Sequence, residues 1–427
     1  MAKAFVVAAP SSGSGKTMLT LGLLRAFKNR GLRVASAKVG PDHIDPRFHE
    51  AASGRPCFNL DPWAMKPEMI SSLLGDLALD ADMIIVEGVM GLFDGPQGAR
   101  GSTADLAQDL RLPVVLVLDA SHQGQSIAAL AEGFVNHRKG LNFAGMILNR
   151  VASDRHAAIL MSALAGNNIP VLGSVRRSDS LNWPSRHLGL VQAQENQDLE
   201  LFIETTSLAV ARETKLDKLL TVGSEVRPES LQACILQPPG QKIAVAHDLA
   251  FSFAYPHILQ GWKRIGAEIS LFSPLQDEVP KAASDAIFLP GGYPELHAGR
   301  ISQNHKFLNA LRNSKALIYG ECGGFMVLGD TLIDAKGQSH PMAGLLPLTT
   351  SFATRKLHLG YRQLTPLGGP WEKPLHGHEF HYSSIANEGS ADRLFATSDA
   401  SGQDLGSIGL TRGNVMGSYA HIICEAP

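Results

Sequence analysis

The chain has 427 residues, more than one ordinary domain needs, so we expect two domains with separate cores. Its 38 basic and 40 acidic residues are intermixed, and the net charge of −2 gives no electrostatic basis for binding nucleic acid or an anionic membrane surface. Its four cysteines form no Cys-x-x-Cys pair, so they predict neither a disulfide framework nor a zinc site. The apolar stretches are too short for a membrane span, and we expect a soluble, cytoplasmic protein.

The first predicted element is a short buried strand over 5–9, which leads into a glycine-containing loop and not into a signal-peptide cleavage site. This loop, 10–17, precedes an amphipathic helix over 19–27, an order typical of a phosphate-binding loop. Lys16 would reach the terminal phosphates and Thr17 would ligate Mg²⁺. The usual opening glycine is absent, and a Ser/Gly-rich helix entry with a solvated lysine is the alternative. The predicted ATP-binding residues are Ser12, Gly13, Ser14, Gly15, Lys16 and Thr17.

Further apolar strands follow along the chain, with helical patterns between them. Each ends at a polar residue, which is typical of a parallel sheet covered on both faces by helices. Ligands bind such sheets at the carboxyl ends of the strands. The strands are predicted over 33–39, 82–87, 113–119, 144–149 and 169–172, and the polar residues at or after their ends are Asp42, Asp45, Glu87, Asp94, Asp119 and Asn149.

Glu87 occupies the position at which P-loop proteins place an acidic residue that organises magnesium. A single carboxylate at a strand end more often caps a helix or meets solvent, and this is the preferred interpretation of Asp119. Asp42, Asp45 and Glu87 together would repel one another unless a cation lies between them. We therefore predict magnesium bound by Thr17, Asp42 and Glu87.

The pattern weakens between 196 and 240, where charged and polar stretches end at a Pro-Pro-Gly turn. We interpret this segment as a linker with some helix, between a domain over 1–195 and a domain over 241–427. Strand patterns then resume and predict a second α/β sheet. The strands are expected over 243–246, 268–272, 285–290 and 316–320, and the helices over 253–265 and 301–311.

A cysteine between glycines ends the last of these strands, in the order Gly320-Glu321-Cys322-Gly323-Gly324. Gly-x-Cys-x-Gly between a strand and a helix is the pattern of a nucleophile elbow, and the helix terminus is expected to lower the thiol pKa. Gly291 and Gly292 follow a neighbouring strand and offer backbone N–H groups for an oxyanion hole. His421, far along the chain, offers a base. The alternatives are a buried structural cysteine and a structural histidine.

The histidine-rich stretch 376–383 lacks the His-Glu-x-x-His spacing of a zinc site. Alternation along a strand would instead point His376, His378 and Phe380 to one face. We expect this stretch and 359–362 to line a cleft facing the ATP domain, with Arg362 and the histidines meeting substrate carboxylates. A solvated loop is the alternative.

Several long motifs resemble the cobyrinic acid a,c-diamide synthase family, which includes enzymes acting on hydrogenobyrinic acid. They are AAPSSGSGKT at 8–17, KVGPDHIDPRFH at 38–49, EGVMGLFDG at 87–95, GSTA at 101–104, Asn149-Arg150 and SRHLGL at 185–190. The resemblance covers nearly the whole chain. It implies an α/β fold, in which a P-loop, dethiobiotin-synthetase-like parallel-sheet domain precedes a triad-type (class I-like) glutamine amidotransferase domain.

The resemblance also implies a reaction. Cys322 would attack the side-chain amide of glutamine, with His421 as base and then acid, and ammonia would leave. Typical triad-type glutamine amidotransferase domains carry His-Pro-Glu, whereas His421 is followed here by Ile422 and Ile423. The third triad member is missing from that place, so we expect weak intrinsic glutaminase activity. What orients His421 stays open.

In the ATP domain, the a- and c-acetate carboxylates of a corrin would become acyl phosphates that ammonia converts to amides. Asp42, Asp45, Glu87 and Asp94 would organise metal and substrate, and Asn149 would bind the nucleotide. His43 stands where tyrosine is usual in the family. The residues assigned to the corrin are His43, Tyr361, Arg362 and His378.

The implied partners are corrin, glutamine and ATP, and a homodimer is compatible with the sequence. Three alternatives are kept: a cobyric acid synthase-like enzyme that amidates other side chains, a dethiobiotin-synthetase-like carboxylase, and a nucleotide-switched partner protein without catalysis. The sequence leaves open whether the corrin contains cobalt, the order of the two amidations, and which acids bind magnesium.

Overall fold

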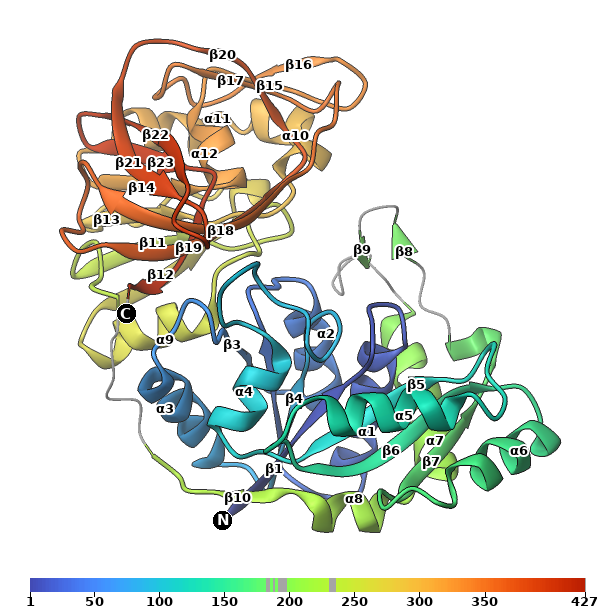
Figure 1. Ribbon diagram of the computed structural model, residues 1–427. Coiled ribbons are helices and arrows are strands. Elements are labelled where there is room, and N and C mark those ends of the chain that lie inside the picture. Colours follow the sequence, from blue (N-terminus) through green and yellow to red (C-terminus); the bar gives the residue numbers. More distant parts are fainter. Residues whose placement is uncertain (182–184, 187–188, 191–197, 230–235, 427) are drawn as a thin grey trace. The chain divides into compact units, whose positions relative to one another are not determined.

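A computed structural model describes residues 1–181, 185–186, 189–190, 198–229 and 236–426 (Figure 1). The chain divides into two compact units, Met1–Ala233 and Cys234–Pro427. Residues 187–188 of the SRHLGL motif, and 196–197 and 230–235 of the predicted linker, lie outside the described residues. In the described part of the chain, no helix combines the length and apolar character that crossing a bilayer requires.

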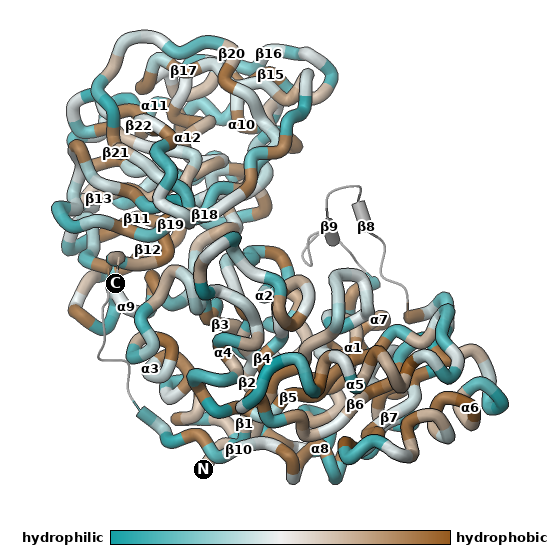
Figure 2. The backbone as a smooth tube through the Cα atoms, in the orientation of Figure 1, coloured by the Kyte–Doolittle hydropathy of each residue, from teal (hydrophilic) through white to brown (hydrophobic). Residues whose placement is uncertain are grey.

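The first unit is built on a sheet whose main strands run parallel in the order β3-β2-β4-β1-β5-β6-β7. Short runs of Val, Ile, Leu and Ala form these strands because helices bury them on both faces. β5 and β6 stand out among the hydrophobic segments in Figure 2. The strands are β1 (Ala2–Ala8), β2 (Val34–Val39), β3 (Cys57–Leu60), β4 (Met83–Glu87), β5 (Val114–Asp119), β6 (Phe143–Val151) and β7 (Val171–Arg176).

The helices of this unit connect successive parallel strands. They are α1 (Lys16–Asn29), α2 (Asp45–Ser53), α3 (Pro67–Ala78), α4 (Thr103–Asp109), α5 (Ile127–His137) and α6 (Asp154–Leu164). From β1 the chain crosses to β2 on one side of the sheet, and it later returns through β4 to β5 on the other side of β1. Such a reversal of strand order opens a crevice at the carboxyl ends of the strands. The loop after β1 lies at this crevice.

The segment predicted as a linker is largely part of the first unit. It forms α7 (Leu199–Glu213), α8 (Leu216–Val222) and β10 (Ser224–Val226), and β10 pairs antiparallel with β1. α7 packs on α1, where buried side chains of both helices share one apolar core. Arg25 of α1 also forms ion pairs with Glu200 and Glu204 of α7. The linker prediction is therefore wrong for 199–226, where charged residues cover the outer face of a packed helix.

Gly22 lets α1 and α7 approach closely, which gives a test of this packing. A Cβ on Gly22 would lie 2.6 Å from Val210 Cγ2 and 3.1 Å from the Thr206 carbonyl oxygen. We expect Gly22→Ala to lower the free energy of unfolding by about 1–3 kcal/mol through overpacking. Gly133→Ala, at an exposed position of α5 (Ile127–His137), is the control, since no atom lies within 4 Å of its added Cβ. Equal stability of the two variants in urea denaturation would contradict the observed packing.

The second unit contains a ten-stranded sheet in the order β12-β11-β13-β14-β23-β22-β21-β18-β19-β24. Its first five strands run parallel, and the strands from β23 onward pair antiparallel. The sequence predicted only the first four. These ten strands are β11 (Lys242–Ala246), β12 (Glu268–Phe272), β13 (Ala286–Leu289), β14 (Leu317–Glu321), β18 (His358–Pro366), β19 (Leu375–His381), β21 (Asp392–Ser398), β22 (Asp404–Arg412), β23 (Val415–Ser418) and β24 (His421–Glu425).

A smaller sheet, β16-β15-β17-β20, and four helices complete the described part of this unit. The predicted helix 253–265 is α9 (Pro256–Arg264), and the predicted helix 301–311 is divided into α10 (Ala298–Gln303) and α11 (His305–Arg312). α12 (Gly323–Leu328) follows β14 directly. The small-sheet strands are β15 (Thr331–Ile333), β16 (Ser339–Pro341), β17 (Leu348–Ser351) and β20 (Ser384–Glu388).

Candidate active sites

A cavity of about 540 Å³ lies at the carboxyl ends of the strands in the first unit. Gly13 (φ 79°) and Gly15 (φ 90°) adopt left-handed backbone conformations, so the loop can turn tightly into α1. This is the geometry of a loop that presents N–H groups to phosphates. Of the predicted site residues, Ser12, Gly13, Gly15, Lys16, Thr17, Asp42, Asp45 and Glu87 line the cavity, together with Lys38 and Arg150.

Lys16 lies in this cavity with its ammonium group held by backbone carbonyls. Its Nζ donates to the oxygens of Ser11 at 3.2 Å and Met90 at 2.5 Å. Burial lowers the pKa of Lys16 to about 8, although the negative charge of Glu87 opposes this shift. A cation that is poorly solvated in this way gains strongly from contact with a phosphate group.

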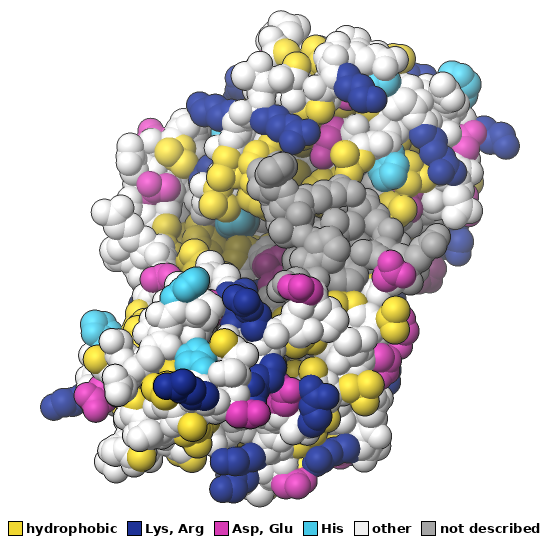
Figure 3. All heavy atoms as spheres, turned by 90° about the vertical axis from the view of Figure 1, so that its right-hand side faces the viewer, with side chains coloured by type: hydrophobic (Ala, Val, Ile, Leu, Met, Phe, Trp, Pro, Cys, Tyr) yellow, Lys and Arg dark blue, Asp and Glu magenta, His cyan; other side chains and the backbone are white. Residues whose placement is uncertain are grey.

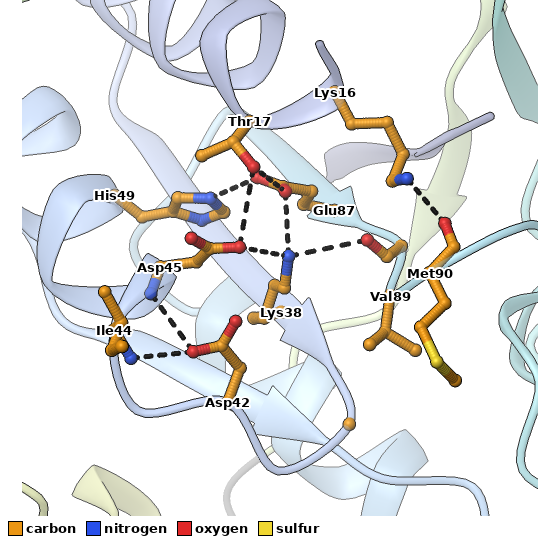
Figure 4. A network of polar contacts seen from close by, with 12 residues as sticks. Lys16, Thr17, Lys38, Asp42, Ile44, Asp45, His49, Glu87, Val89 and Met90 are labelled. Atoms are coloured by element: carbon orange, nitrogen blue, oxygen red, sulfur yellow. Dashed lines mark hydrogen bonds and ion pairs between the residues drawn. The ribbon is translucent and has the colours of Figure 1, made fainter. Parts of the chain in front are cut away.

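Two of the predicted carboxylates, Asp45 and Glu87, converge on a cation of the protein itself, Lys38 (Figure 4). Its Nζ lies 2.5 Å from Asp45 Oδ2 and 2.8 Å from Glu87 Oε1. The Thr17 hydroxyl donates to Glu87 Oε1 at 2.6 Å and lies 3.5 Å from Asp45 Oδ2. The predicted repulsion between the acids is therefore relieved by Lys38, which sequence reasoning did not assign.

Charge–charge contacts decide the protonation of this buried cluster. Burial disfavours the charged form of Lys38, but Asp45 and Glu87 outweigh it and raise the Lys38 pKa. Burial disfavours ionised Glu87 as well, yet Lys38 and His49 hold the Glu87 pKa below its usual value. For Asp45, burial and the neighbouring Asp42 raise the pKa to about 7. Glu87 is thus the firmly ionised carboxylate of the cluster.

His49 contacts the Glu87 oxygen that Thr17 and Lys38 do not use. Its Nε2 lies 2.6 Å from Glu87 Oε2, and its Nδ1 lies 3.4 Å from Cys57 Sγ. The His49 ring, the Cys57 thiol and the Glu87 carboxylate are all fully buried. Burial opposes a charge on His49, but Cys57 and Glu87 raise its pKa to about 10. Glu87 is therefore fixed from three directions by Lys38, Thr17 and His49.

Four residues that were predicted to belong to this site lie outside the cluster around Lys38. Asn149 donates to the Ser14 carbonyl at 2.9 Å, so it holds the phosphate-binding loop. Asp42 accepts the N–H groups of Ile44 at 2.7 Å and Asp45 at 3.3 Å, which fixes the start of α2. Exposed Asp94 accepts the Gly91 N–H at 2.8 Å and closes its own turn. His43 is half-buried beside Asp42 and does not line the cavity.

Cys322 lies between β14 and α12 with φ 47° and ψ −105°, a conformation that a residue with a side chain rarely adopts. Such strain at the junction of a strand and a helix is the geometry of a nucleophile elbow. Gly320 and Gly324 permit it, because a Cβ on Gly324 would lie 1.9 Å from the Leu289 carbonyl oxygen. The predicted elbow is present.

The prediction of a lowered thiol pKa is wrong. Burial raises the pKa of Cys322, the negative charge of Glu295 raises it further, and the Gly323 N–H opposes this only in part. α12 is a helix of six residues, too short to overcome the loss of solvent. The resting group is therefore a thiol, and its reaction requires a base.

His421 begins β24 and lies beside Cys322 across Gly291. A Cβ on Gly291 would lie 2.3 Å from His421 Cε1, 3.1 Å from His421 Nε2 and 3.1 Å from Cys322 Cβ. Burial lowers the pKa of His421 to about 3. The imidazole is thus neutral at physiological pH.

The predicted oxyanion residues adjoin the elbow. The Gly291 carbonyl accepts the Phe253 N–H at 2.9 Å, which fixes this loop. A Cβ on Gly323 would lie 3.1 Å from the Gly292 nitrogen, so the Gly292 backbone is packed against the residue that follows the nucleophile. This neighbourhood is where an oxyanion hole is needed.

Glu321, immediately before Cys322, also borders His421. Its Oε2 lies 3.8 Å from His421 Nδ1, and its Oε1 accepts the Ile422 N–H at 3.0 Å. Sequence reasoning missed this residue. Its position at the end of an apolar strand, next to the nucleophile, could have indicated it. A carboxylate buried there requires a partner, because an unpaired buried charge is costly.

The residues predicted to bind substrate in the second unit lie on β18 and β19. Arg362 donates to Glu379 at 2.7 Å and to the Tyr361 carbonyl at 3.0 Å, so its guanidinium already serves a buried carboxylate. The Tyr361 ring lies edge-on to His378 at 5.4 Å. His378 is opposite His421 in the strand register. The prediction that Arg362 meets substrate carboxylates is thus not supported by its contacts.

Glu379 also accepts from His381 Nε2 at 2.8 Å, and the His358 ring stacks on His381 at 4.7 Å. Ligand atoms of these three residues lie within 4.8 Å of one another, as a metal site would require. Both Glu379 oxygens are occupied by Arg362 and His381, however. The arrangement is a buried ion-pair network.

Two sequence comparisons agree with this geometry. Residues 5–191 match the model of the CobQ/CobB/MinD/ParA nucleotide binding domain, and residues 242–427 match that of the CobB/CobQ-like glutamine amidotransferase domain. The chain is 56% identical to the hydrogenobyrinate a,c-diamide synthase of Brucella anthropi, with 99% of this chain and 98% of that protein covered. The corresponding proteins of Rhizobium meliloti and Rhodobacter capsulatus are 50% and 48% identical, with 98% or more of each chain covered.

Proposed function

This chain belongs to the hydrogenobyrinate a,c-diamide synthase family, and from this membership we propose a residue-level division of the reaction between its two units. The chain is a ligase that performs glutamine-dependent amidation of a corrin in cobalamin biosynthesis. Its first unit contains a nucleotide-binding domain and its second a glutamine amidotransferase domain.

A carboxylate does not condense with ammonia in water, because it is a poor electrophile without a good leaving group. In the proposed reaction, an oxygen of a corrin acetate attacks the γ-phosphorus of ATP and ADP leaves. Ammonia then attacks the carbonyl carbon of this acyl phosphate, and inorganic phosphate departs with that oxygen. Catalysis of phosphoryl transfer is mainly positioning and charge stabilisation. The first unit offers both in its phosphate-binding loop and buried lysines.

Lys16 is proposed to stabilise charge on the transferred phosphoryl group. Its burial and lowered pKa support this role, since a desolvated ammonium interacts strongly with an anion. Lys38 is proposed to keep Glu87 ionised and to place Asp45 against Thr17, as its two short ion pairs indicate. Asn149 would serve the nucleotide indirectly, through the loop that it holds.

The donor atoms around Lys38 fit a magnesium ion. Thr17 Oγ1, Glu87 Oε1 and an Asp45 oxygen are hard oxygen ligands that approach one another closely. We propose that Thr17 and Glu87 hold the ion, with Asp45 nearer to them than Asp42. Bound magnesium would neutralise charge on the phosphates.

In the second unit, Cys322 Sγ is proposed to attack the glutamine side-chain amide while His421 takes the thiol proton. His421 then protonates the leaving nitrogen, and ammonia departs from a glutamyl thioester that water hydrolyses. Backbone N–H groups at Gly291 and Gly292 would stabilise the oxyanion. The single observation that carries this proposal is the strained Cys322 backbone with a neutral imidazole beside it.

Gly291 gives a steric test of this arrangement. A methyl group there would lie 2.3 Å from His421 Cε1, so the ring must move away from Cys322. We expect Gly291→Ala to lower kcat for glutamine-dependent amidation by about 10²-fold or more, as misplaced catalytic groups do. Amidation with added ammonia should be unchanged. Gly299→Ala is the control, because its Cβ would lie at an ordinary 3.6 Å from the nearest side-chain atom.

Mass spectrometry of the corrin product tests the reaction class. Two successive decreases of about one mass unit are expected with ATP, magnesium and glutamine, since each acid becomes an amide. Fragmentation that places the amides on other side chains would favour a cobyric acid synthase-like activity. An increase by the mass of carbon dioxide would favour the carboxylase, and an unchanged corrin would favour the non-catalytic alternative.

A further inference from the structure

We propose that Glu321 is the positioning residue that holds the His421 imidazole for proton transfer, in the role of the triad glutamate that is absent after His421. This inference rests on the proposed function of Cys322 and His421. Glu321 ends β14 and directly precedes the nucleophile. One short segment of chain would therefore supply both the thiol and the carboxylate of the triad.

The two oxygens of Glu321 have different contacts. Oε1 accepts the Ile422 N–H at 3.0 Å and the Tyr319 hydroxyl at 3.2 Å, so it fixes the side chain and the start of β24 together. Oε2 lies 3.8 Å from His421 Nδ1. The side chains of both Glu321 and His421 are at most 5% exposed. The carboxylate is thus held by one oxygen and turned toward the ring with the other.

The Nε2 edge of the ring lies close to Gly291, which also borders Cys322. His421 Nε2 and Cys322 Cβ each lie 3.1 Å from the position of a Cβ on Gly291, whereas Nδ1 is the atom near Glu321. A base that accepts the thiol proton on Nε2 must carry its own proton on Nδ1. A carboxylate beside Nδ1 favours that tautomer and stabilises the imidazolium that forms.

The distance of 3.8 Å is longer than a hydrogen bond, and catalytic hydrogen bonds often tighten only when substrate binds. The Ile422 N–H contact makes such a closing movement short, because it ties the backbone beside His421 to the same carboxylate. Only the imidazole needs to rotate. Glu321 therefore restricts the orientation of the His421 ring before glutamine binds.

Protonation of Glu321 makes the role measurable. Burial raises the pKa of Glu321 to about 8, against the contacts with Ile422 and Tyr319. Below that pH, a carboxylic acid on Oε2 would donate to Nδ1 and leave the proton on Nε2, where the ring cannot act as base. Glutaminase activity should therefore rise with pH through about 8.

The pKa values of other titratable groups around Glu321 and His421 are also shifted. Burial lowers the pKa of His421 to about 3, with His378 and His381 lowering it further and Glu379 opposing them. Burial raises the pKa of Tyr319, as does the charge of Glu321, and burial also raises that of Cys322. A rise in glutaminase activity through about pH 8 is thus the signature expected of Glu321.

The test uses the full chain and Glu321→Gln. The amide keeps the size of the side chain and an oxygen for the Ile422 N–H, but its NH₂ group would face Nδ1 and favour the wrong tautomer. We expect kcat for glutamine-dependent amidation to fall by about 10²- to 10⁴-fold, as for tautomer-disrupting changes in other triads. KM for glutamine and ammonia-dependent amidation should stay near wild type. Glu425→Gln, on β24, is the matched control.

The outcomes separate this inference from the proposed function. If Cys322→Ala retains glutamine-dependent activity, the proposed function itself fails. If Cys322→Ala is inactive with glutamine while Glu321→Gln keeps the wild-type kcat, only the role of Glu321 is overturned. The pH profile of wild-type glutaminase activity, measured without corrin, gives a test that needs no variant, because a profile that does not rise through about pH 8 would contradict the proposal. Glu321→Asp should restore part of the activity, since it restores the charge.

Discussion

Replacing Cys322 with alanine is expected to abolish glutamine-dependent amidation and to leave ammonia-dependent amidation at the wild-type rate. Removing the thiol removes the only nucleophile of the proposed glutaminase, and loss of such a group typically costs about 10⁴-fold or more in kcat. Added ammonia bypasses the step, because the acyl phosphate is formed in the other unit. The measurement is amide formation on the corrin, with glutamine or with an ammonium salt at alkaline pH.

Cys424→Ala is the control for loss of a buried thiol, since Cys424 lies on β24 of the same unit. It should retain both activities. Cys322 should also be the residue alkylated by a reactive glutamine analogue, and saturating glutamine should protect it. Glutamine-dependent activity in Cys322→Ala, or loss of both activities in a folded variant, would contradict the division of labour between the units.

Lys16→Met is expected to abolish amidation with either nitrogen donor. The variant keeps the length of the side chain but removes the charge that faces the transferred phosphoryl group, which is worth about 10³-fold or more in comparable sites. The measurement is ADP release together with amide formation. Alkylation of Cys322 by the glutamine analogue should proceed at the wild-type rate.

Stability distinguishes this effect from misfolding. Burial lowers the pKa of Lys16 to about 8, so the folded state disfavours the charge below the unfolded-state pKa. The Tm of the Lys16→Met variant should therefore equal or exceed that of the wild type. Lys28→Met, in the last turn of α1, is the control and should retain activity. Full ADP release by Lys16→Met would show that another group stabilises the phosphoryl transfer.

Much of the fold follows from local pattern. The strand, glycine loop and helix around Lys16 form because a buried apolar run must end where the backbone turns, and only glycines tolerate the turns at Gly13 and Gly15. β3 escaped prediction because Asn59 interrupts its short apolar run. The antiparallel strands that follow β23 in the sheet order were missed for a different reason. Their half-exposed faces carry polar residues, so they do not form continuous apolar runs. Surface charge agrees with expectation, and Figure 3 shows both signs intermixed on the face that it presents.

The site was predictable where chemistry depends on position in a strand. Thr17, Glu87 and Cys322 each lie at a strand end or a helix start, so parallel topology was enough to locate them. Lys38 was missed although a lysine inside an apolar strand requires a buried partner. The pKa of Cys322 and the pairing of Arg362 could not be predicted, because they depend on burial and on partners distant in sequence.

The most direct test of the acyl phosphate is the fate of the oxygen atoms of the corrin carboxylates. Hydrogenobyrinate labelled with ¹⁸O in its acetate groups would be incubated with ATP, magnesium and glutamine, and the released phosphate analysed by mass spectrometry. The proposed route transfers one labelled oxygen to inorganic phosphate for each amide formed. Phosphate without label, or label found in AMP, would contradict activation of the carboxylate by the γ-phosphoryl group.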